Sequence, residues 1–500
     1  MTDHFQALEN YFKRIARIDH ARTFLQWDHM VMMPPGGNQS RSEAMAELTA
    51  LRHEMLISPE LGDLLGRAAE GLQDPIRLRS LQEMERMYKR AICLPAELVK
   101  AKSLAGSICE HGWRSQRKNN DWQGFLANFQ EVVRLAREEA QARCDFRPGH
   151  FPTPYDALLD LYCTGDSSSF IAGIFAGLKR ELPELVRQVV ARQKTETIAD
   201  LRGHYPIELQ QQLNRELMIC LGFDFDRGRQ DVSAHPFSTG GRGDQRITTR
   251  YRDNDFLDAL LATAHETGHA AYEDGLPAEW DGLPIGFARN MCLHESQSLL
   301  FEKQLFLSRS FITYFRSAIH RLLPATAEFD GAALWAATTR VQPSFIRVEA
   351  DEVTYPLHVI LRYEIESGLI NGSLLARDIP AVWDAKMIQY LNLSTEGNYT
   401  DGCLQDMHWS DGSFGYFPSY TIGALNSAQL FAALRRNHPD WQDLLAAGEA
   451  GFIRTWLKNN IWSKASSMDS QEIMQAASGE KTNPDYFLNH IRARYLEGLN

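Results

Sequence analysis

Several features that mark common classes of protein are missing from this sequence. The seven cysteines are widely spaced and form no CxxC pair, so neither a disulfide framework nor a thiolate zinc knuckle is favoured. No apolar run approaches the roughly 18 residues needed to span a bilayer. The first residues also lack the basic start and apolar run of a signal peptide. We therefore expect a cytoplasmic protein that does not act at a membrane.

Positive charge is scarcer than negative charge. The 500 residues include 52 Lys and Arg against 64 Asp and Glu, which gives a formal net charge of −12. Nucleic-acid binding needs a basic face that displaces counterions, so we expect no nucleic-acid partner. The apolar fraction of 44% and the charged fraction of 23% are close to the globular average, which excludes a disordered chain.

Apolar residues recur at helical spacing along most of the chain. Phe125 and Phe129 belong to one such pattern, for which Asn120 or Asp121 is the expected N-cap. The same pattern predicts further helices at 40–56, from Pro59 onward, at 170–193 and from Asn483 onward. No linker rich in Pro, Gly or Ser separates the halves, so we predict a mainly α-helical protein with one large continuous fold.

Two glycine-rich regions interrupt the helical pattern. Between Val232 and Arg250, glycines are followed by β-branched residues, which predicts a small β hairpin or ribbon. Between Asp411 and Gly423, glycines alternate with aromatic residues, and we expect an ordered loop there.

The strongest chemical signal is the sequence HETGH, which runs from His265 to His269. Positions i and i+4 share one face of a helix, so both imidazoles can reach one metal ion. Glu266 lies beside them and can take a proton from a water whose pKa a zinc ion lowers to about 7. An apolar stripe over 256–264 predicts that this helix is buried. The alternative is a buried helix whose histidines bond only to neighbouring side chains.

A third metal ligand is needed, and Glu295 is the strongest candidate. The elongated HExxH form that uses a third histidine is excluded because that position is Gly275. Glu295 belongs to the sequence HESQS, which opens a helical run, and Glu302 lies two turns further on the same side. Glu273 and Asp274 are rivals, but they follow the histidines on the same helix and are less able to complete a tetrahedron.

These residues resemble the carboxypeptidase Taq family of metallocarboxypeptidases. Further motifs of that family are present in the expected order, namely WD at 27–28, MPPGG at 33–37, HPF at 235–237, DQRIT at 244–248, IRVEAD at 346–351, GCLQDMHW at 402–409 and SGE at 478–480. The resemblance covers nearly the whole chain.

The resemblance implies an enzyme that hydrolyses the C-terminal peptide bond of peptides with a free C-terminus, with broad specificity. It implies a Zn²⁺ cofactor, although Co²⁺ or another divalent ion suits the same ligands. It also implies a deep central groove, a β ribbon beside the zinc helix and a homodimer. The chain 1–500 is then one metallocarboxypeptidase domain, with an N-terminal helical part at about 1–200 and a catalytic part at about 201–500.

A carboxypeptidase must hold a free carboxylate, which arginine does with a planar pair of donors. Arg347 in the IRVEAD motif is the candidate, and its alternative role is a structural salt bridge to Asp351 one turn away. The oxyanion that develops during hydrolysis needs a donor, for which His408 and Tyr420 are candidates.

The ribbon motifs supply two further candidates. His235 and Arg246 are expected either to line the substrate cleft or to hold the ribbon together, and Asp244 with Arg246 resembles a scaffold pair. Asp406 is expected to orient His408 or a metal-binding imidazole.

Two other functions compete with this one. A helical oligopeptidase that cuts internal bonds of short peptides uses the same ligands, because HExxH does not distinguish the two reactions. A helical binding protein with a vestigial metal site is the non-enzymatic alternative, although both histidines and Glu266 are present.

Overall fold

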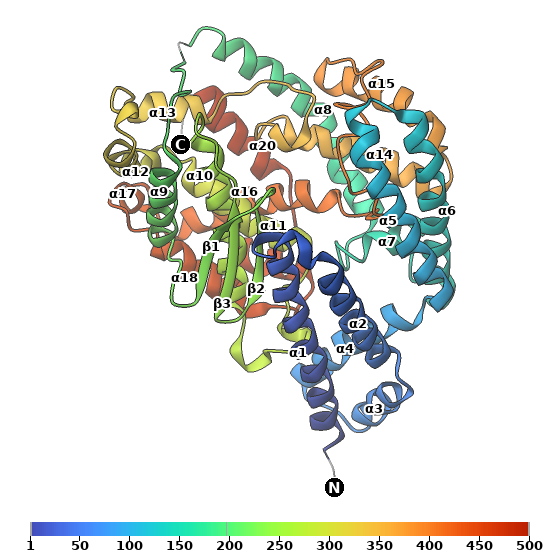
Figure 1. The fold of residues 1–500 in the computed structure, drawn as a ribbon. Helices are drawn as coiled ribbons and strands as arrows, with labels where there is room; N and C mark the ends of the chain where they lie inside the picture. The colour runs from blue at the N-terminus through green and yellow to red at the C-terminus, as the bar shows by residue number, and fades with distance from the viewer. Residues whose placement is uncertain (1–2, 197, 499–500) are drawn as a thin grey trace.

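The computed structural model describes residues 3–196 and 198–498, and it confirms the mainly helical fold (Figure 1). The α-helices are α1 (His4–Val31), α2 (Asn38–Ile57), α3 (Pro59–Ala69), α4 (Pro75–Ile92), α5 (Ala96–Lys118), α6 (Trp122–Phe146), α7 (Pro154–Leu159), α8 (Ser168–Gln193), α9 (Ile207–Cys220), α10 (Leu257–Gly275), α11 (Met291–Leu299), α12 (Arg309–Leu322), α13 (Gly331–Thr338), α14 (Tyr355–Asn371), α15 (Ile379–Leu391), α16 (Pro418–Asn437), α17 (Trp441–Ala446), α18 (Gly451–Asn460), α19 (Ser470–Ser478) and α20 (Asp485–Ile491). Within the described ranges, no helix combines the length and apolar character needed to cross a membrane.

The predicted helix boundaries agree with the local capping chemistry. Helix α6 begins after Asp121, whose side chain accepts a hydrogen bond from the backbone N–H of Gly124. Helix α3 has Pro59 at its first position and Ser58 as its N-cap. Helix α20 continues as a π-helical segment, Arg492–Glu497.

The predicted ribbon is present as part of a three-stranded sheet. Strands β2 (Phe237–Gly241) and β3 (Asp244–Thr249) form the antiparallel hairpin, and β1 (Gly228–Val232) pairs parallel to β3 on its other side. The sequence pattern missed β1 because its residues, GRQDV, are mostly polar and carry no alternating apolar signal. The sheet contacts α10 through β2 and β3, so the ribbon lies beside the helix of the HETGH motif.

The loop predicted between Asp411 and Gly423 is too long. Its first part consists of turns, but α16 begins at Pro418 and includes both Tyr420 and Gly423. Pro418 occupies the first helical position, where proline is favoured, and this was the signal for a helix start.

Three large hydrophobic clusters form the core. One joins α6, α7 and α8 to α14, α15 and α16, a second surrounds α10, α11 and α12, and a third lies among α1, α3 and α4. In Figure 1 the helices of the third cluster extend from the lower end of the molecule, near the N-terminus. That cluster also contains Leu283 and Ile285, so the N-terminal helices are docked on the segment that leads to α11. The division at about residue 200 stays a prediction.

Candidate metal centre

Helices α10 and α11 bring the predicted metal ligands together. Helix α10 carries His265, Glu266 and His269, and α11 crosses it and carries Glu295. The two backbones approach so closely that a Cβ on Gly268 would lie 2.6 Å from the carbonyl oxygen of Gln297. Glycine is therefore required at this crossing.

The donor atoms of these residues converge on one point. The carboxylate Oε2 of Glu295 lies 3.7 Å from Nε2 of His265 and 3.4 Å from Nε2 of His269. The potential ligand atoms all lie within 4.8 Å of one another. Bond lengths of 2.0–2.2 Å around a tetrahedral ion imply ligand separations of about 3.4 Å. The geometry of the three side chains therefore fits a divalent ion.

The rival ligands point elsewhere. Glu273 pairs with Nε2 of His294 at 2.8 Å, and Asp274 pairs with Arg227 at 2.8 Å. Both side chains are thus occupied by partners outside the convergence point.

Glu302 fixes the orientation of His265. Its Oε2 lies 2.9 Å from Nδ1 of His265, and its other oxygen pairs with Lys303 at 2.6 Å. When Nδ1 carries the proton, Nε2 presents its lone pair toward Glu295, which is the arrangement that a metal-binding histidine needs. Glu302 lies in a π-helical segment, Leu300–Phe306, that continues α11. The sequence placed Glu302 on the correct side but did not reveal this role.

A similar arrangement orients His269. Its Nδ1 lies 2.6 Å from Nδ1 of His294, whose Nε2 lies 2.8 Å from Oε1 of Glu273. With protons on Nδ1 of His269 and Nε2 of His294, every contact in this chain joins a donor to an acceptor. His269 then also presents its Nε2 lone pair toward Glu295. No pattern in the sequence indicated this function of His294, although the residue directly precedes Glu295.

The electrostatics of the site favour a cation. Burial by itself lowers the pKa of His265, but Glu295 and Glu302 outweigh burial and raise it to about 9. The same carboxylate charges that attract a proton to this site also attract a metal ion. Burial lowers the pKa of His269 to about 4, so its imidazole is neutral and can donate a lone pair. Burial raises the pKa of Glu266 to about 7.

Arg347 belongs to a buried cluster whose anion is Asp406. Its Nε and Nη2 donate to Oδ1 of Asp406 at 3.0 and 2.8 Å, and Arg362 donates to Oδ2 at 2.6 Å. The predicted alternative partner, Asp351, is wrong, because Asp351 instead accepts hydrogen bonds at the start of α14, among them that of the Thr354 N–H. Long-range packing brings Arg347 to Asp406, while Asp351 caps its own local turn.

Asp406 was predicted to orient an imidazole, but the hydrogen bonds that it accepts come from two arginines. Both of its oxygens are taken by Arg347 and Arg362. The two predicted oxyanion donors lie together without a hydrogen bond from either to Asp406. Nε2 of His408 is 3.1 Å from the hydroxyl of Tyr420. Burial raises the pKa of Tyr420 more than the charge of Arg347 lowers it, so the hydroxyl keeps its proton and can donate a hydrogen bond.

Arg347 also contacts this side of the site. Its Nη1 donates to the hydroxyl of Tyr355 at 2.8 Å, and its guanidinium lies 5.0 Å from the centre of the Tyr420 ring. The arginine is therefore held between Asp406 and two tyrosines.

The ribbon residues lie apart from this cluster of contacts. Arg246 pairs with Asp244 at 2.6 Å and stacks over the ring of Trp27 at 4.5 Å, so it ties β3 to α1. His235 is exposed in the connection between β1 and β2. The contacts of Arg246 agree with a role in holding the ribbon.

Known proteins match this chain along nearly its whole length. The family model described as carboxypeptidase Taq (M32) metallopeptidase matches residues 7–495. Thermostable carboxypeptidase 1 of Thermus thermophilus is 34% identical over 501 residues, which cover 98% of each chain. Carboxypeptidase 1 of Bacillus subtilis is 32% identical over 97% of this chain and 96% of its own. The structure of metallocarboxypeptidase 1 from Trypanosoma cruzi has a TM-score of 0.97 at 36% identity and covers 99% of this chain and 100% of its own.

Proposed function

This chain belongs to the carboxypeptidase Taq family of metallopeptidases, and from that premise we propose that it is a zinc-dependent enzyme that removes single residues from peptide C-termini. As a family member it is a metallocarboxypeptidase, and the family implies a divalent metal. The observation that carries the finer proposal is the convergence of His265, His269 and Glu295 beside the carboxylate of Glu266.

We propose that His265, His269 and Glu295 hold the ion. A zinc ion at this position supplies a Lewis acid that polarises the scissile carbonyl and lowers the pKa of water. Cobalt or another divalent ion suits the same donors. Glu302 and His294 contact Nδ1 of the two histidine ligands and so keep Nε2 of each imidazole directed toward the ion.

Glu266 is the proposed general base. Its side chain neighbours the first ligand and is almost fully buried, so its carboxylate acts where water competes little. It accepts a proton from the attacking water and then delivers that proton to the leaving amine. His408 and Tyr420 are the proposed donors to the developing oxyanion, since their nitrogen and hydroxyl lie side by side.

Arg347 is the proposed anchor for the substrate carboxylate. Asp406 and Tyr355 accept hydrogen bonds from three of its five N–H groups and hold the guanidinium in one orientation, and these contacts leave the other two N–H groups for a carboxylate. His235 and Arg246 are proposed to border the cleft from the ribbon side. The deep groove, the homodimer and the single domain over 1–500 are likewise proposals from the family resemblance.

Hydrolysis of matched peptides tests the direction of cleavage. The metal-loaded protein is incubated with a peptide that has a free C-terminus and with the same peptide as a C-terminal amide, and mass spectrometry follows the products. We expect a ladder that shortens by one residue at a time from the free peptide and little reaction of the amide. Equal cleavage of both peptides at internal bonds would instead favour the oligopeptidase, which the family does not favour.

Arg347→Ala extends the same assay to the anchor. Comparing the two peptides on one variant cancels any loss of folded protein, because both rates fall by the same factor. We expect the free peptide to lose its advantage over the amide. A preference that persists unchanged would remove Arg347 from carboxylate binding.

A further inference from the structure

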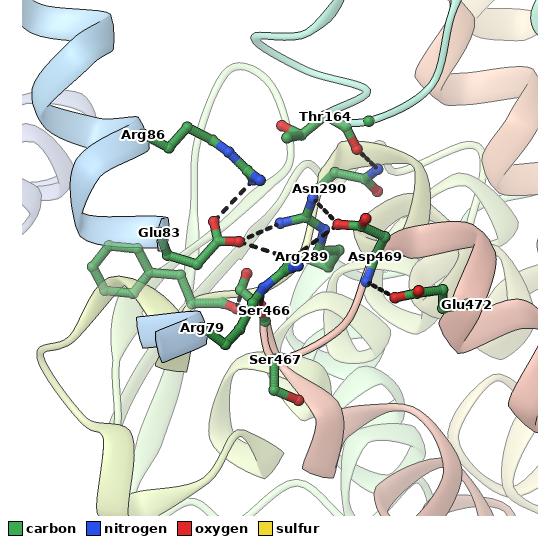
Figure 2. Close-up of polar contacts among 12 residues, drawn as sticks. Arg79, Glu83, Arg86, Thr164, Arg289, Asn290, Ser466, Ser467, Asp469 and Glu472 are labelled. Atoms are coloured by element: carbon green, nitrogen blue, oxygen red, sulfur yellow. Dashed lines mark hydrogen bonds and ion pairs between the residues drawn. The ribbon is translucent and has the colours of Figure 1, made fainter. Parts of the chain in front are cut away.

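An ion-pair cluster around a buried arginine lies outside the metal centre, where the N-terminal helices meet the rest of the molecule. We call it the Arg289 cluster, and its members are Arg79, Glu83, Arg86, Arg289 and Asp469. Figure 2 shows their side chains converging from α4, from the residue before the N-cap of α11 and from the N-cap of α19. None of these residues takes part in the proposed mechanism.

Arg289 is the centre of this cluster. Its side chain is 1% exposed, and it pairs with Glu83 through Nη1 at 3.1 Å and with Asp469 through Nη2 at 2.9 Å. A buried guanidinium without such partners is strongly unfavourable, because its charge loses the solvation that water provides. The position of Arg289 therefore depends on both carboxylates.

Helix α4 presents one charged face to Arg289. Arg79, Glu83 and Arg86 are spaced four and three residues apart, so they lie on the same side of the helix. Arg79 pairs with Glu83 at 2.8 Å, and Arg86 pairs with it at 2.9 Å. Side chains of α4 itself thus hold the Glu83 carboxylate in one orientation. Arg289 therefore pairs with a carboxylate whose position is already restricted.

The backbone of Arg289 is joined to both metal-binding helices. Its N–H donates to the hydroxyl of Tyr272 at 3.3 Å, and Tyr272 lies on α10 three residues after His269. The next residue, Asn290, is the N-cap of α11, and its side chain accepts a hydrogen bond from the N–H of Leu293. Arg289 therefore sits where α10 and the first turn of α11 meet.

Glu295 is close to this entry point along a short helix. The rise of 1.5 Å per residue places its Cα about 6 Å along the helix axis from Met291, the first residue of α11. On the other side of α11, a Cβ on Gly423 of α16 would lie 2.7 Å from the Cβ of Glu295, so the helix has no space to shift there. The contacts at the start of α11 therefore act together with this packing to place the carboxylate of Glu295 relative to the imidazoles.

We infer that Arg289, held by Glu83 and Asp469, is a positioning residue for the metal ligand Glu295. The N-terminal helices thereby contribute to metal binding without touching the metal. This inference rests on the proposed metal centre. A merely structural contact between α4 and Arg289 would lower the stability of the fold but leave the metal affinity of the folded protein unchanged.

Glu83→Gln tests the inference, because glutamine keeps the shape of the side chain and removes its charge. The matched control is Glu85→Gln on the same helix, where Glu85 pairs with exposed Lys89 at 2.6 Å. Zn²⁺ affinity is measured by competition with a chelator, and visible absorption of the Co²⁺-loaded full chain reports the coordination geometry. We expect Glu83→Gln to bind Zn²⁺ about 10- to 100-fold more weakly, the usual effect of disturbing a ligand's support. Its Co²⁺ spectrum should change, and Glu85→Gln should match the unaltered protein in both measurements.

Affinity and spectrum of Glu83→Gln that equal those of Glu85→Gln would overturn the inference, even if the melting temperature falls. Should Glu83→Gln fail to fold, Asp469→Asn decides the same question, because asparagine also caps helices and so preserves the start of α19. The proposed metal centre fails separately, if the unaltered protein itself binds no Zn²⁺ or if Glu295→Ala binds it equally well.

Discussion

Two buried clusters of histidine and glutamate within the described residues differ in the source of their positive charge, which is a side chain in one and the proposed metal ion in the other. At the metal centre, Glu295 faces the Nε2 atoms of two imidazoles, with further carboxylates nearby. At the C-terminal end of the chain, Glu352 accepts hydrogen bonds from His490, from Arg494 and from the hydroxyl of Tyr495, each at 2.9 Å. We call this second group the Glu352 cluster.

The comparison shows how a binding site is distinguished from a structural ion pair. Arg494 supplies a permanent positive charge inside the Glu352 cluster, so that carboxylate is satisfied when the protein folds. At the metal centre Lys303 pairs with Glu302, but the ion-pair partners of Glu295 in the described part of the chain are the two histidines, and a divalent ion fits between them. Burial alone is therefore a poor indicator of function, and the balance of charge within the cluster is the better one.

The largest effect is expected for Glu266→Gln. This change removes the proposed base and keeps all ligands, so the rate should fall by about 10²- to 10⁴-fold while the metal content stays the same. Peptide hydrolysis and metal analysis on one preparation measure both quantities. A variant with the original rate would exclude Glu266 as the base.

Glu295→Ala and Glu352→Ala should have opposite consequences in the two clusters. Glu295→Ala should lose metal on dialysis because a ligand is missing. It should remain folded because other carboxylates remain beside the histidines. Glu352→Ala should keep its metal and lose about 3–5 kcal/mol of stability, because it leaves Arg494 buried without its anion. Metal content and urea unfolding distinguish the two, and a Glu295→Ala protein that retains full occupancy would move the third ligand elsewhere.

Glu302→Gln should have a smaller effect on the metal centre. Glutamine can still accept the Nδ1–H of His265 but carries no charge, so metal affinity should fall by about 10- to 100-fold. Competition with a chelator measures this change. Unaltered affinity would mean that Glu302 serves only to neutralise Lys303.

The smallest effect is expected in the pH dependence of stability. Burial by itself raises the pKa of Glu352, but His490 and Arg494 outweigh burial and hold that pKa well below its ordinary value of 4.5. The unfolded chain therefore takes up a proton at a higher pH than the folded protein does. The stabilising contribution is complete above about pH 4.5 and is lost as the pH falls below it.

Glu352→Gln should consequently flatten the acid side of the stability profile. One proton contributes at most about 1.4 kcal/mol per pH unit to the slope. Urea unfolding between pH 3 and 6 compares the variant with the unaltered protein. Identical slopes would show that Glu352 does not contribute to acid unfolding.

Local patterns in the sequence were sufficient to predict much of the fold. The helices over 40–56 and 170–193 follow from apolar spacing, and the start of α6 follows from the capping chemistry of Asp121. Strand β1 and the early start of α16 were missed. The polar residues of β1 become a strand only by pairing with β3, and the signal of Pro418 was obscured by the glycines before it.

The sequence by itself was enough to select His265 and His269 as the proposed ligand pair and Glu266 as the proposed base, because residues four apart on a helix share a face wherever that helix is placed. The tertiary structure decided the rest. Glu302 and His294 orient the two imidazoles. Asp406 pairs with Arg347, which lies 59 residues earlier in the sequence, and the Arg289 cluster joins α4 to α11. Such partnerships depend on how distant segments pack against one another, and helical periodicity contains no information about that packing.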